Sequence, residues 1–287
     1  MRQKTIDFIF SVAKDPRGFE KLEKFVNKFK KKELIENILD CGVLPEVFSH
    51  DSSEEKMWAK YSDVMLARCL TLLGLKAEVL GARGNSADVL AKAKEYTIVA
   101  DAKTFRLSRT AKNQKDFKVQ ALDNWRLNYH YSLLVSPLYQ YPSRDSQIYR
   151  QAITRNVTLF SYSHLLFLLN QGKKFNLAPV WNIGNTLKKS SKEKDFSNSA
   201  LYWGKMDEIV CGIAKKELVD LVKYKNTTIE RTKFLGNEGI SYWENKIQEY
   251  NKLSKTKAIG MLIKAHKIDQ KIKQIRKAID IKNLTIV

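Results

Sequence analysis

The residues best suited to chemistry in this chain are an acid and a lysine, Asp101 and Lys103, which stand two positions apart at the end of the weakly polar segment 96–102. In a β-strand, residues i and i+2 project from the same face, so the carboxylate and the ammonium would lie side by side. A carboxylate can hold Mg²⁺, and a lysine beside it can orient or help deprotonate a metal-activated water. The pair therefore suits metal-dependent hydrolysis of a phosphate ester.

An acid followed two residues later by lysine is weak evidence alone, because a lysine-rich chain produces the pattern by chance. The pattern occurs six times, in Glu54-Glu55-Lys56, Asp101-Ala102-Lys103, Asp116-Phe117-Lys118, Glu244-Asn245-Lys246, Asp269-Gln270-Lys271 and Asp280-Ile281-Lys282. Four of these lie in regions of helical character, where side chains two apart point about 200° away from each other. Asp280 remains a competitor, since residues 278–287 could form a terminal strand. A surface ion pair at a strand end is the other interpretation of Asp101 and Lys103.

A second carboxylate distinguishes Asp101 from its competitor. Residues 87–91 and 96–102 are short and weakly polar, and the polar bend 92–95 separates them, which is typical of a β-hairpin. Asp88 stands across this predicted hairpin from Asp101. Two carboxylates form a hard oxygen site suited to Mg²⁺, which keeps several waters and completes its shell with phosphate oxygens.

A basic loop follows the proposed catalytic strand. Residues 104–118 contain five cationic side chains, interleaved with Asn, Gln, Ser and Thr. Phosphates are bound by Lys and Arg, whereas base edges are read by Asn or Gln for adenine, Lys or Arg for guanine, and Asp for cytosine. Asn113, Gln114, Lys115 and Asp116 supply all of these groups. A solvated loop in which Asp116 caps the next helix is the alternative interpretation, and the two roles are compatible.

The surrounding elements follow from hydrophobic periodicity. Residues 1 to about 40 are helical, and a second helix begins near Ser53 and ends near Gly74. After the hairpin, the pattern predicts a helix around Phe117 to Trp125, a strand over 132–135, a helix around Ile148 to Ile153, a strand over 157–161 and a buried helix over 164–169. This β-α-β-α-β order generates a central sheet covered by helices, an α/β (α+β) fold. Residues 173–198 are expected to form an extended loop, and helical periodicity returns from Glu208.

The bulk composition narrows the partners. The chain has 287 residues, 44% of them hydrophobic, and a net charge of +20, which points to a polyanionic partner. No apolar run is long enough to span a bilayer, and charged residues interrupt the first twenty positions, so we expect a cytoplasmic protein. Cys41, Cys69 and Cys211 lack metal-ligand spacing and are interpreted as small buried hydrophobes. We expect one nuclease domain over 1–287, with a helical part to about 75, a sheet core over about 76–170 and a basic helical part over about 200–287.

Four segments together resemble the HindIII-type restriction endonucleases, a family of the PD-(D/E)xK nuclease superfamily. They are Ser53-Glu54-Glu55-Lys56, Ala87-Asp88-Val89, the stretch 99–118 and the stretch 134–142, which reads LVSPLYQYP. The resemblance is strongest from about residue 53 to 170, and its specificity comes from the long match around the basic loop. The superfamily's proline before the first acid is replaced here by Ala87. The resemblance implies a restriction-endonuclease-like central mixed sheet flanked by helices, with extra N- and C-terminal helices.

The resemblance also implies a function and a set of residues. It implies a homodimeric type II enzyme that needs Mg²⁺ and cuts double-stranded DNA at a short palindrome, AAGCTT for this family. Asp88, Asp101 and the backbone carbonyl of Ala102 would hold the metal, and Lys103 would be the catalytic lysine. Glu55 either joins the metal shell or only places a charge at its helix N-terminus. The base-reading residues would be Asn113, Lys115 and Asp116, and the other DNA contacts would be Arg106, Arg109, Lys112 and Lys118.

Two other functions stay open on the sequence. A sequence-specific DNA-binding protein without catalysis would need the basic loop but not the group of Asp88, Asp101 and Lys103. A DNA repair nuclease of the same superfamily would share the group but lack site specificity. An RNA-binding module is disfavoured, because the chain shows no RRM or KH signature.

Overall fold

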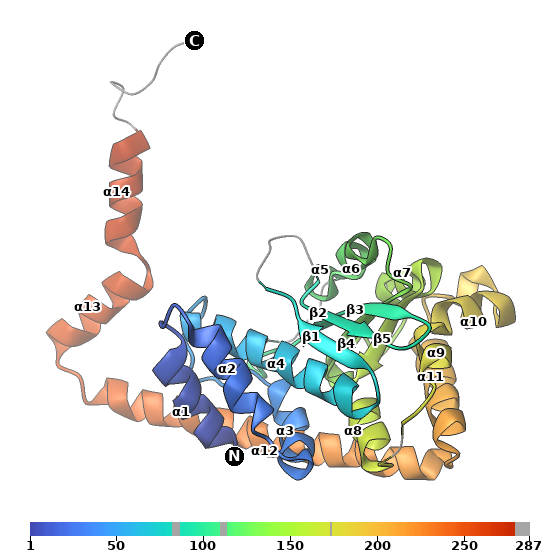
Figure 1. The fold of residues 1–287 in the computed structure, drawn as a ribbon. Coiled ribbons are helices and arrows are strands. Elements are labelled where there is room, and N and C mark those ends of the chain that lie inside the picture. Colours follow the sequence, from blue (N-terminus) through green and yellow to red (C-terminus); the bar gives the residue numbers. More distant parts are fainter. Residues whose placement is uncertain (82–86, 110–113, 173, 279–287) are drawn as a thin grey trace. The chain divides into compact units, whose positions relative to one another are not determined.

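The computed structural model describes residues 1–81, 87–109, 114–172 and 174–278 (Figure 1). The chain forms two compact units, Met1–Gly239 and Ile240–Val287. The larger unit contains one sheet, and this sheet carries the predicted acid and lysine. No helix in the described ranges is long and apolar enough to cross a membrane.

The first unit opens with helices, as the periodicity predicts. They are α1 (Arg2–Val12), α2 (Gly18–Asn27), α3 (Lys31–Cys41) and α4 (Ser53–Leu72). Ser52 caps α4 by accepting a hydrogen bond from the backbone N–H of Glu55 at 3.1 Å, and Glu54 and Glu55 place negative charge in the first turn. Both features stabilise a helix start. The long helix α4 lies along β1, β2 and β3, so it can bring side chains to the sheet.

Five strands form a mixed sheet in the order β1-β2-β3-β4-β5, which confirms the predicted fold class. They are β1 (Lys76–Val79), β2 (Val89–Lys92), β3 (Thr97–Ala102), β4 (Tyr131–Ser136) and β5 (Val157–Ser161). The first three pair antiparallel, with Val89 opposite Ala100, so the predicted hairpin is confirmed. The last three pair parallel. The edge strand β1 was not predicted, because four residues that alternate between exposed and half-buried positions give too short a signal.

Helices connect the parallel strands and cover them. They are α5 (Gln114–Phe117), α6 (Val119–Arg126), the 3₁₀ turn η1 (Leu138–Gln140), α7 (Gln147–Arg155) and α8 (Tyr162–Asn170). Helix α6 contacts β3, β4 and β5, while α7 contacts β5 and α6 (Figure 1). All five residues of β5 are buried, as expected of a parallel strand covered on both faces. Helix α8 is buried almost throughout, which confirms the prediction for 164–169.

The prediction of an extended loop over 173–198 is wrong. This range contains α9 (Ala178–Trp181), α10 (Ile183–Ser190) and the 3₁₀ turn η2 (Glu193–Asp195). The composition is polar, but Leu177, Val180, Trp181 and Leu187 are fully buried. Apolar side chains at helical spacing pack against the sheet and outweigh the weak helix propensity of the Asn and Ser residues around them.

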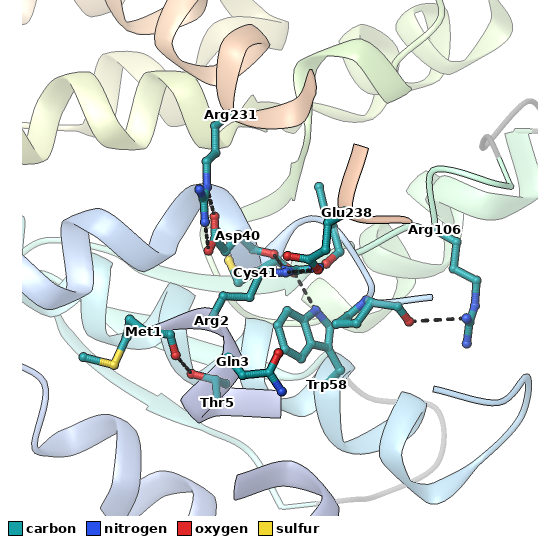
Figure 2. Close-up of polar contacts among 12 residues, drawn as sticks. Met1, Arg2, Gln3, Thr5, Asp40, Cys41, Trp58, Arg106, Arg231 and Glu238 are labelled. Carbon is teal, nitrogen blue, oxygen red and sulfur yellow. Dashed lines mark hydrogen bonds and ion pairs between the residues drawn. The ribbon is translucent and has the colours of Figure 1, made fainter. Parts of the chain in front are cut away.

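The C-terminal part is helical, as predicted, with α11 (Ser199–Ala214) and α12 (Leu218–Asn251). The first part of α12 is tied to the N-terminal helices by ion pairs (Figure 2). Arg231 makes two hydrogen bonds of 2.6 Å to the carboxylate of Asp40, and Arg2 donates to Glu238 at 3.0 Å. Arg2 is buried and also lies over the ring of Trp58. Charge-assisted bidentate pairs of this kind fix two elements in one register.

The second unit comprises the end of α12 together with α13 (Lys255–Ala265) and α14 (Ile268–Ala278). Among its described residues none is buried, and large apolar side chains such as Trp243, Ile247 and Ile272 are about half exposed. Of the possible strand over 278–287, Ala278 ends α14, and residues 279–287, with Asp280 and Lys282, lie outside the described residues.

Candidate active site

Asp101 and Lys103 stand at the carboxyl end of β3, where the chain leaves the sheet. Lys103 Nζ lies 2.5 Å from Asp101 Oδ2, so the two side chains are neighbours, as strand geometry requires. The backbone of Lys103 is held from two sides, because its N–H donates to the Val135 carbonyl at 2.7 Å and its carbonyl accepts from Tyr162 Oη at 3.1 Å. The lysine therefore starts from a rigid position beside the carboxylate.

Asp88 lies beside Asp101 because of the hairpin register. It directly precedes Val89, which pairs with Ala100, so the turn into β2 carries Asp88 to the end of β3 where Asp101 stands. The Asp88 carbonyl accepts a hydrogen bond from the Leu80 N–H at 2.8 Å, which ties this turn to the chain after β1. The Asp88 side chain is 33% exposed, and it is the most open acid of the group.

A third carboxylate, Asp63 on α4, completes the group and was not predicted. Asp63, Asp88 and Asp101 each offer an oxygen, and the three oxygens lie within 4.8 Å of one another. Asp63 is only 5% exposed, and its Oδ1 accepts the backbone N–H of Ala102 at 3.4 Å. A signal existed in the sequence, because Asp63 lies between the apolar residue Tyr61 and the apolar positions 64–66 on a helix that must bury them. A charged residue at a buried position needs a partner, and Lys60, one turn earlier, is the partner that helical spacing offers.

Two lysines share the group with the three acids. Lys60, one turn before Asp63 on α4, hydrogen-bonds to Asp88 and lies 3.6 Å from Asp63, while Lys103 pairs with Asp101. With all five groups ionised, three negative and two positive charges leave one negative charge. The excess is reflected in the pKa values. Burial and repulsion by Asp88 and Asp101 hold the pKa of Asp63 well above its usual range.

The pKa of Asp101 is also raised, but less than that of Asp63. Burial raises the pKa of its carboxyl, although the charge and hydrogen bond of Lys103 oppose the rise. Buried carboxylates with an unbalanced charge attract a cation. Three oxygen ligands without histidine or cysteine suit a hard divalent cation and not zinc. The residues present therefore fit a divalent metal ion.

Glu55 and Arg106 lie together, outside the group of three carboxylates. Glu55 Oε2 is 3.3 Å from Arg106 Nη2 and also accepts the backbone N–H of Asp51. Arg106 is 10% exposed and donates to the carbonyls of Pro45 and Glu46 at 3.3 and 3.4 Å. Arg106 thus anchors the start of the basic loop, and contacting a phosphate would require it to leave these partners.

The rest of the loop is placed as follows. Arg109 and Lys118 are exposed, and Lys118 is close enough to lower the pKa of Asp101. Asp116 is half-buried inside the single turn α5 and lines a pocket with Glu55, Arg106 and Arg109. It does not cap the next helix, since the N-cap of α6 is Lys118 in the left-handed conformation. Lys112 and Asn113 lie outside the described residues, and Lys115 is placed only by its backbone in α5.

A second cluster contains a serine, a histidine and an acid. Ser161 Oγ lies 2.6 Å from His164 Nδ1, and His164 Nε2 lies 2.8 Å from Asp207 Oδ1. Lys225 pairs with the other oxygen of Asp207 at 2.5 Å. Ser161 and His164 are fully buried, so a substrate cannot reach them. The three cysteines are also free and buried, as predicted.

Comparisons with known proteins agree with the geometry. The model of the HindIII restriction endonuclease family matches residues 9–279. The type II restriction enzyme HindIII of Haemophilus influenzae is 37% identical over 261 residues, which cover 88% of this chain and 86% of that enzyme. The family match over residues 9–279 includes α4, the hairpin and the basic loop, which together hold every residue of the carboxylate group.

Proposed function

The chain belongs to the HindIII restriction endonuclease family, and from this premise we propose that it cuts both strands of DNA at AAGCTT, with Mg²⁺ as its cofactor. Its activity is that of a type II restriction endonuclease, a site-specific deoxyribonuclease. The palindrome, the identity of the metal, the homodimer and a cytoplasmic location are parts of the proposal. A noncatalytic DNA-binding protein would have no use for an unbalanced buried charge.

One observation carries the catalytic proposal: three carboxylates and Lys103 meet at the end of β3, where the basic loop begins. Asp63, Asp88 and Asp101, with the backbone carbonyl of Ala102, would hold the ion. A bound Mg²⁺ would neutralise charge on the phosphate and lower the pKa of a water. Lys103 would orient that water or accept its proton, and Lys118 would attract the phosphate from the exposed side.

The proposed homodimer follows from the symmetry of the substrate. A palindrome has a two-fold axis, so two identical chains related by the same axis can cut equivalent bonds on the two strands. The net charge of +20 supports contact with a polyanion along a large surface. Asn113, Lys115 and Asp116 would read base edges, while Arg109 and Lys112 would contact the DNA backbone.

Digestion of plasmid DNA tests the activity and the site together. We expect Mg²⁺ to produce discrete fragments whose sequenced ends all derive from AAGCTT, and EDTA to stop the reaction. The matched control is Asp101→Asn, which keeps the shape of the side chain but removes its charge and should not cut. Fragments with random ends would instead identify a nonspecific nuclease, and cutting in excess chelator would exclude the carboxylate mechanism.

Binding in Ca²⁺, which should permit binding with little cutting, tests base reading. Losing a base contact through Asn113→Ala or Lys115→Ala should cost roughly 1 to 3 kcal/mol on the cognate site and relax discrimination at one position. Losing a phosphate contact through Arg109→Ala should weaken all sequences alike and flatten the salt dependence. Equal weakening by all three variants would mean that another element reads the sequence.

A further inference from the structure

Lys60 is the cation of the site that neither the strand pattern nor the acid-x-lysine motif identifies. Its ammonium hydrogen-bonds to Asp88 Oδ1 and lies 3.6 Å from Asp63 Oδ2. Its side chain is 29% exposed. It therefore lies among the oxygens that would hold the metal, and it reaches them from α4, while Lys103 approaches from β3.

The contacts of Lys60 differ from those of Lys103. The Lys103 ammonium pairs with Asp101, two residues earlier in the chain, whereas the Lys60 ammonium joins α4 to the hairpin across 28 residues. Burial alone would lower the pKa of Lys60, but the hydrogen bond to Asp88 and the charge of Asp63 raise it above its ordinary value. The lysine is thus charged, and its charge keeps two mutually repelling carboxylates together.

The position is also one that Lys60 can leave. Its side chain lines a mostly apolar pocket together with Met57 and Leu80, and this pocket also contains Lys56. A lysine stem is apolar and flexible, so it can lie in this pocket while its ammonium moves toward water. Asp88 is the most exposed acid of the group, so it is the oxygen a hydrated ion reaches first.

We propose that Lys60 is a resident counter-ion that occupies Asp88 in the metal-free protein and competes with the divalent cation for that carboxylate. The inference rests on the proposed function, in which the three carboxylates bind a divalent ion. An ammonium and a divalent ion that share one carboxylate repel each other, so Lys60 must move away when the ion binds. Lys60 thereby keeps Asp63 and Asp88 close together in the metal-free protein and lowers their affinity for a divalent ion.

Calcium binding by the intact protein without DNA tests this inference independently of cleavage. Isothermal titration calorimetry should show that Lys60→Met binds Ca²⁺ roughly tenfold more tightly than the unmodified protein, because the variant removes a positive charge that would repel the ion. Lys60→Gln, a second neutral variant, should behave in the same way. Lys60→Arg, which keeps the charge, should bind no more tightly than the unmodified protein. The matched control is Lys56→Met, one turn earlier and exposed, which should change nothing.

Thermal unfolding provides a second measurement. Without metal, Lys60→Met should melt at a lower temperature than the unmodified protein, because Asp63 and Asp88 lose their shared counter-ion, and saturating Ca²⁺ should raise its melting temperature by a larger amount. Unchanged or weaker Ca²⁺ binding by both neutral variants would overturn the role of Lys60 while leaving the metal site intact. Equal Ca²⁺ binding by the unmodified protein and by Asp101→Asn would overturn the metal site itself, and with it both proposals.

Discussion

The group around Asp101 and the group around His164 are both buried, yet their charges balance differently. In the first, three carboxylates face two lysines, and the pKa of Asp63 is held well above its usual range. In the second, Asp207 faces Lys225 and His164. Burial lowers the pKa of His164, which keeps the ring neutral. Despite burial, the hydrogen bonds from His164 and Lys225 lower the pKa of Asp207.

We interpret the difference as one between the proposed metal site and a structural link. The second group resembles the order of a nucleophilic triad, but Ser161 is buried and uses its hydroxyl to cap α8 by accepting the His164 N–H. The negative charge of Asp207 is balanced by Lys225, and the group joins α8 to α11 and α12. The first group lacks one positive charge and is partly open at Asp88. The unmatched charge, more than the residue types, is the reason we propose the first group as the metal site.

The largest expected effect is loss of cleavage in the first group. Asp101→Ala or Lys103→Ala should reduce the cleavage rate at least about a thousandfold, or ~4 kcal/mol in the barrier. Initial rates on plasmid DNA measure this. Ser161→Ala should cut normally per folded molecule, because its hydroxyl is not a nucleophile. The joint substitution of Asp280 and Lys282 should also preserve cleavage. If the Asp280 and Lys282 double variant lost cleavage while Asp101→Ala still cut DNA, the catalytic pair would be Asp280 and Lys282.

The next effect is a loss of stability in the second group. Asp207→Ala leaves Lys225 and His164 without their shared acceptor, and breaking a buried pair in this way should lower the free energy of unfolding by about 3 kcal/mol. Urea unfolding measures the change. Cleavage per folded molecule should be unaffected, so a catalytic defect at unchanged stability would mean that this cluster serves the reaction and not the fold.

A smaller and opposite effect is expected at Asp63. Its folded-state pKa is raised, so the charged form costs stability once the pH exceeds the unfolded value, and the cost is full above the folded value. Without metal, Asp63→Asn should therefore stabilise the protein by on the order of 1 kcal/mol at pH 8. The gain should disappear as the pH falls below the unfolded value of about 3.9, where Asp63 becomes protonated in both states. Unfolding curves across this range test the sign, and destabilisation at pH 8 would contradict the charge imbalance.

The smallest effect is expected at Glu55, which stands near the site but pairs with Arg106. Glu55→Gln should leave Ca²⁺ affinity unchanged, because Glu55 lies outside the group of three carboxylates, and it should cost at most about 1 kcal/mol in stability. Isothermal titration calorimetry should compare the Ca²⁺ affinity of Glu55→Gln with that of Asp63→Asn. An equal fall in Ca²⁺ affinity in both variants would place Glu55 in the metal shell.

The sequence alone was sufficient for the hairpin, the parallel strands and the pair of Asp101 and Lys103. These features depend on residues close together in the chain, and the side-chain alternation of a strand translates spacing directly into proximity. The match of segments around the basic loop also identified the family, as the comparisons show. Asp88 could be placed for the same reason, because one hairpin turn separates it from its partner.

Only the tertiary structure brought in Asp63 and Lys60 and set Glu55 apart. Both come from α4, and which turn of a helix faces a strand end depends on packing across the whole sheet, not on spacing along the chain. The helices within 173–198 were missed for a similar reason, since burial of Trp181 and Leu187 decides their structure against a polar composition. The charge balance of the site likewise depends on which side chains the fold brings together. Five ionisable groups from three segments meet, and with all of them ionised one negative charge is in excess, a sum that no single segment of the chain contains.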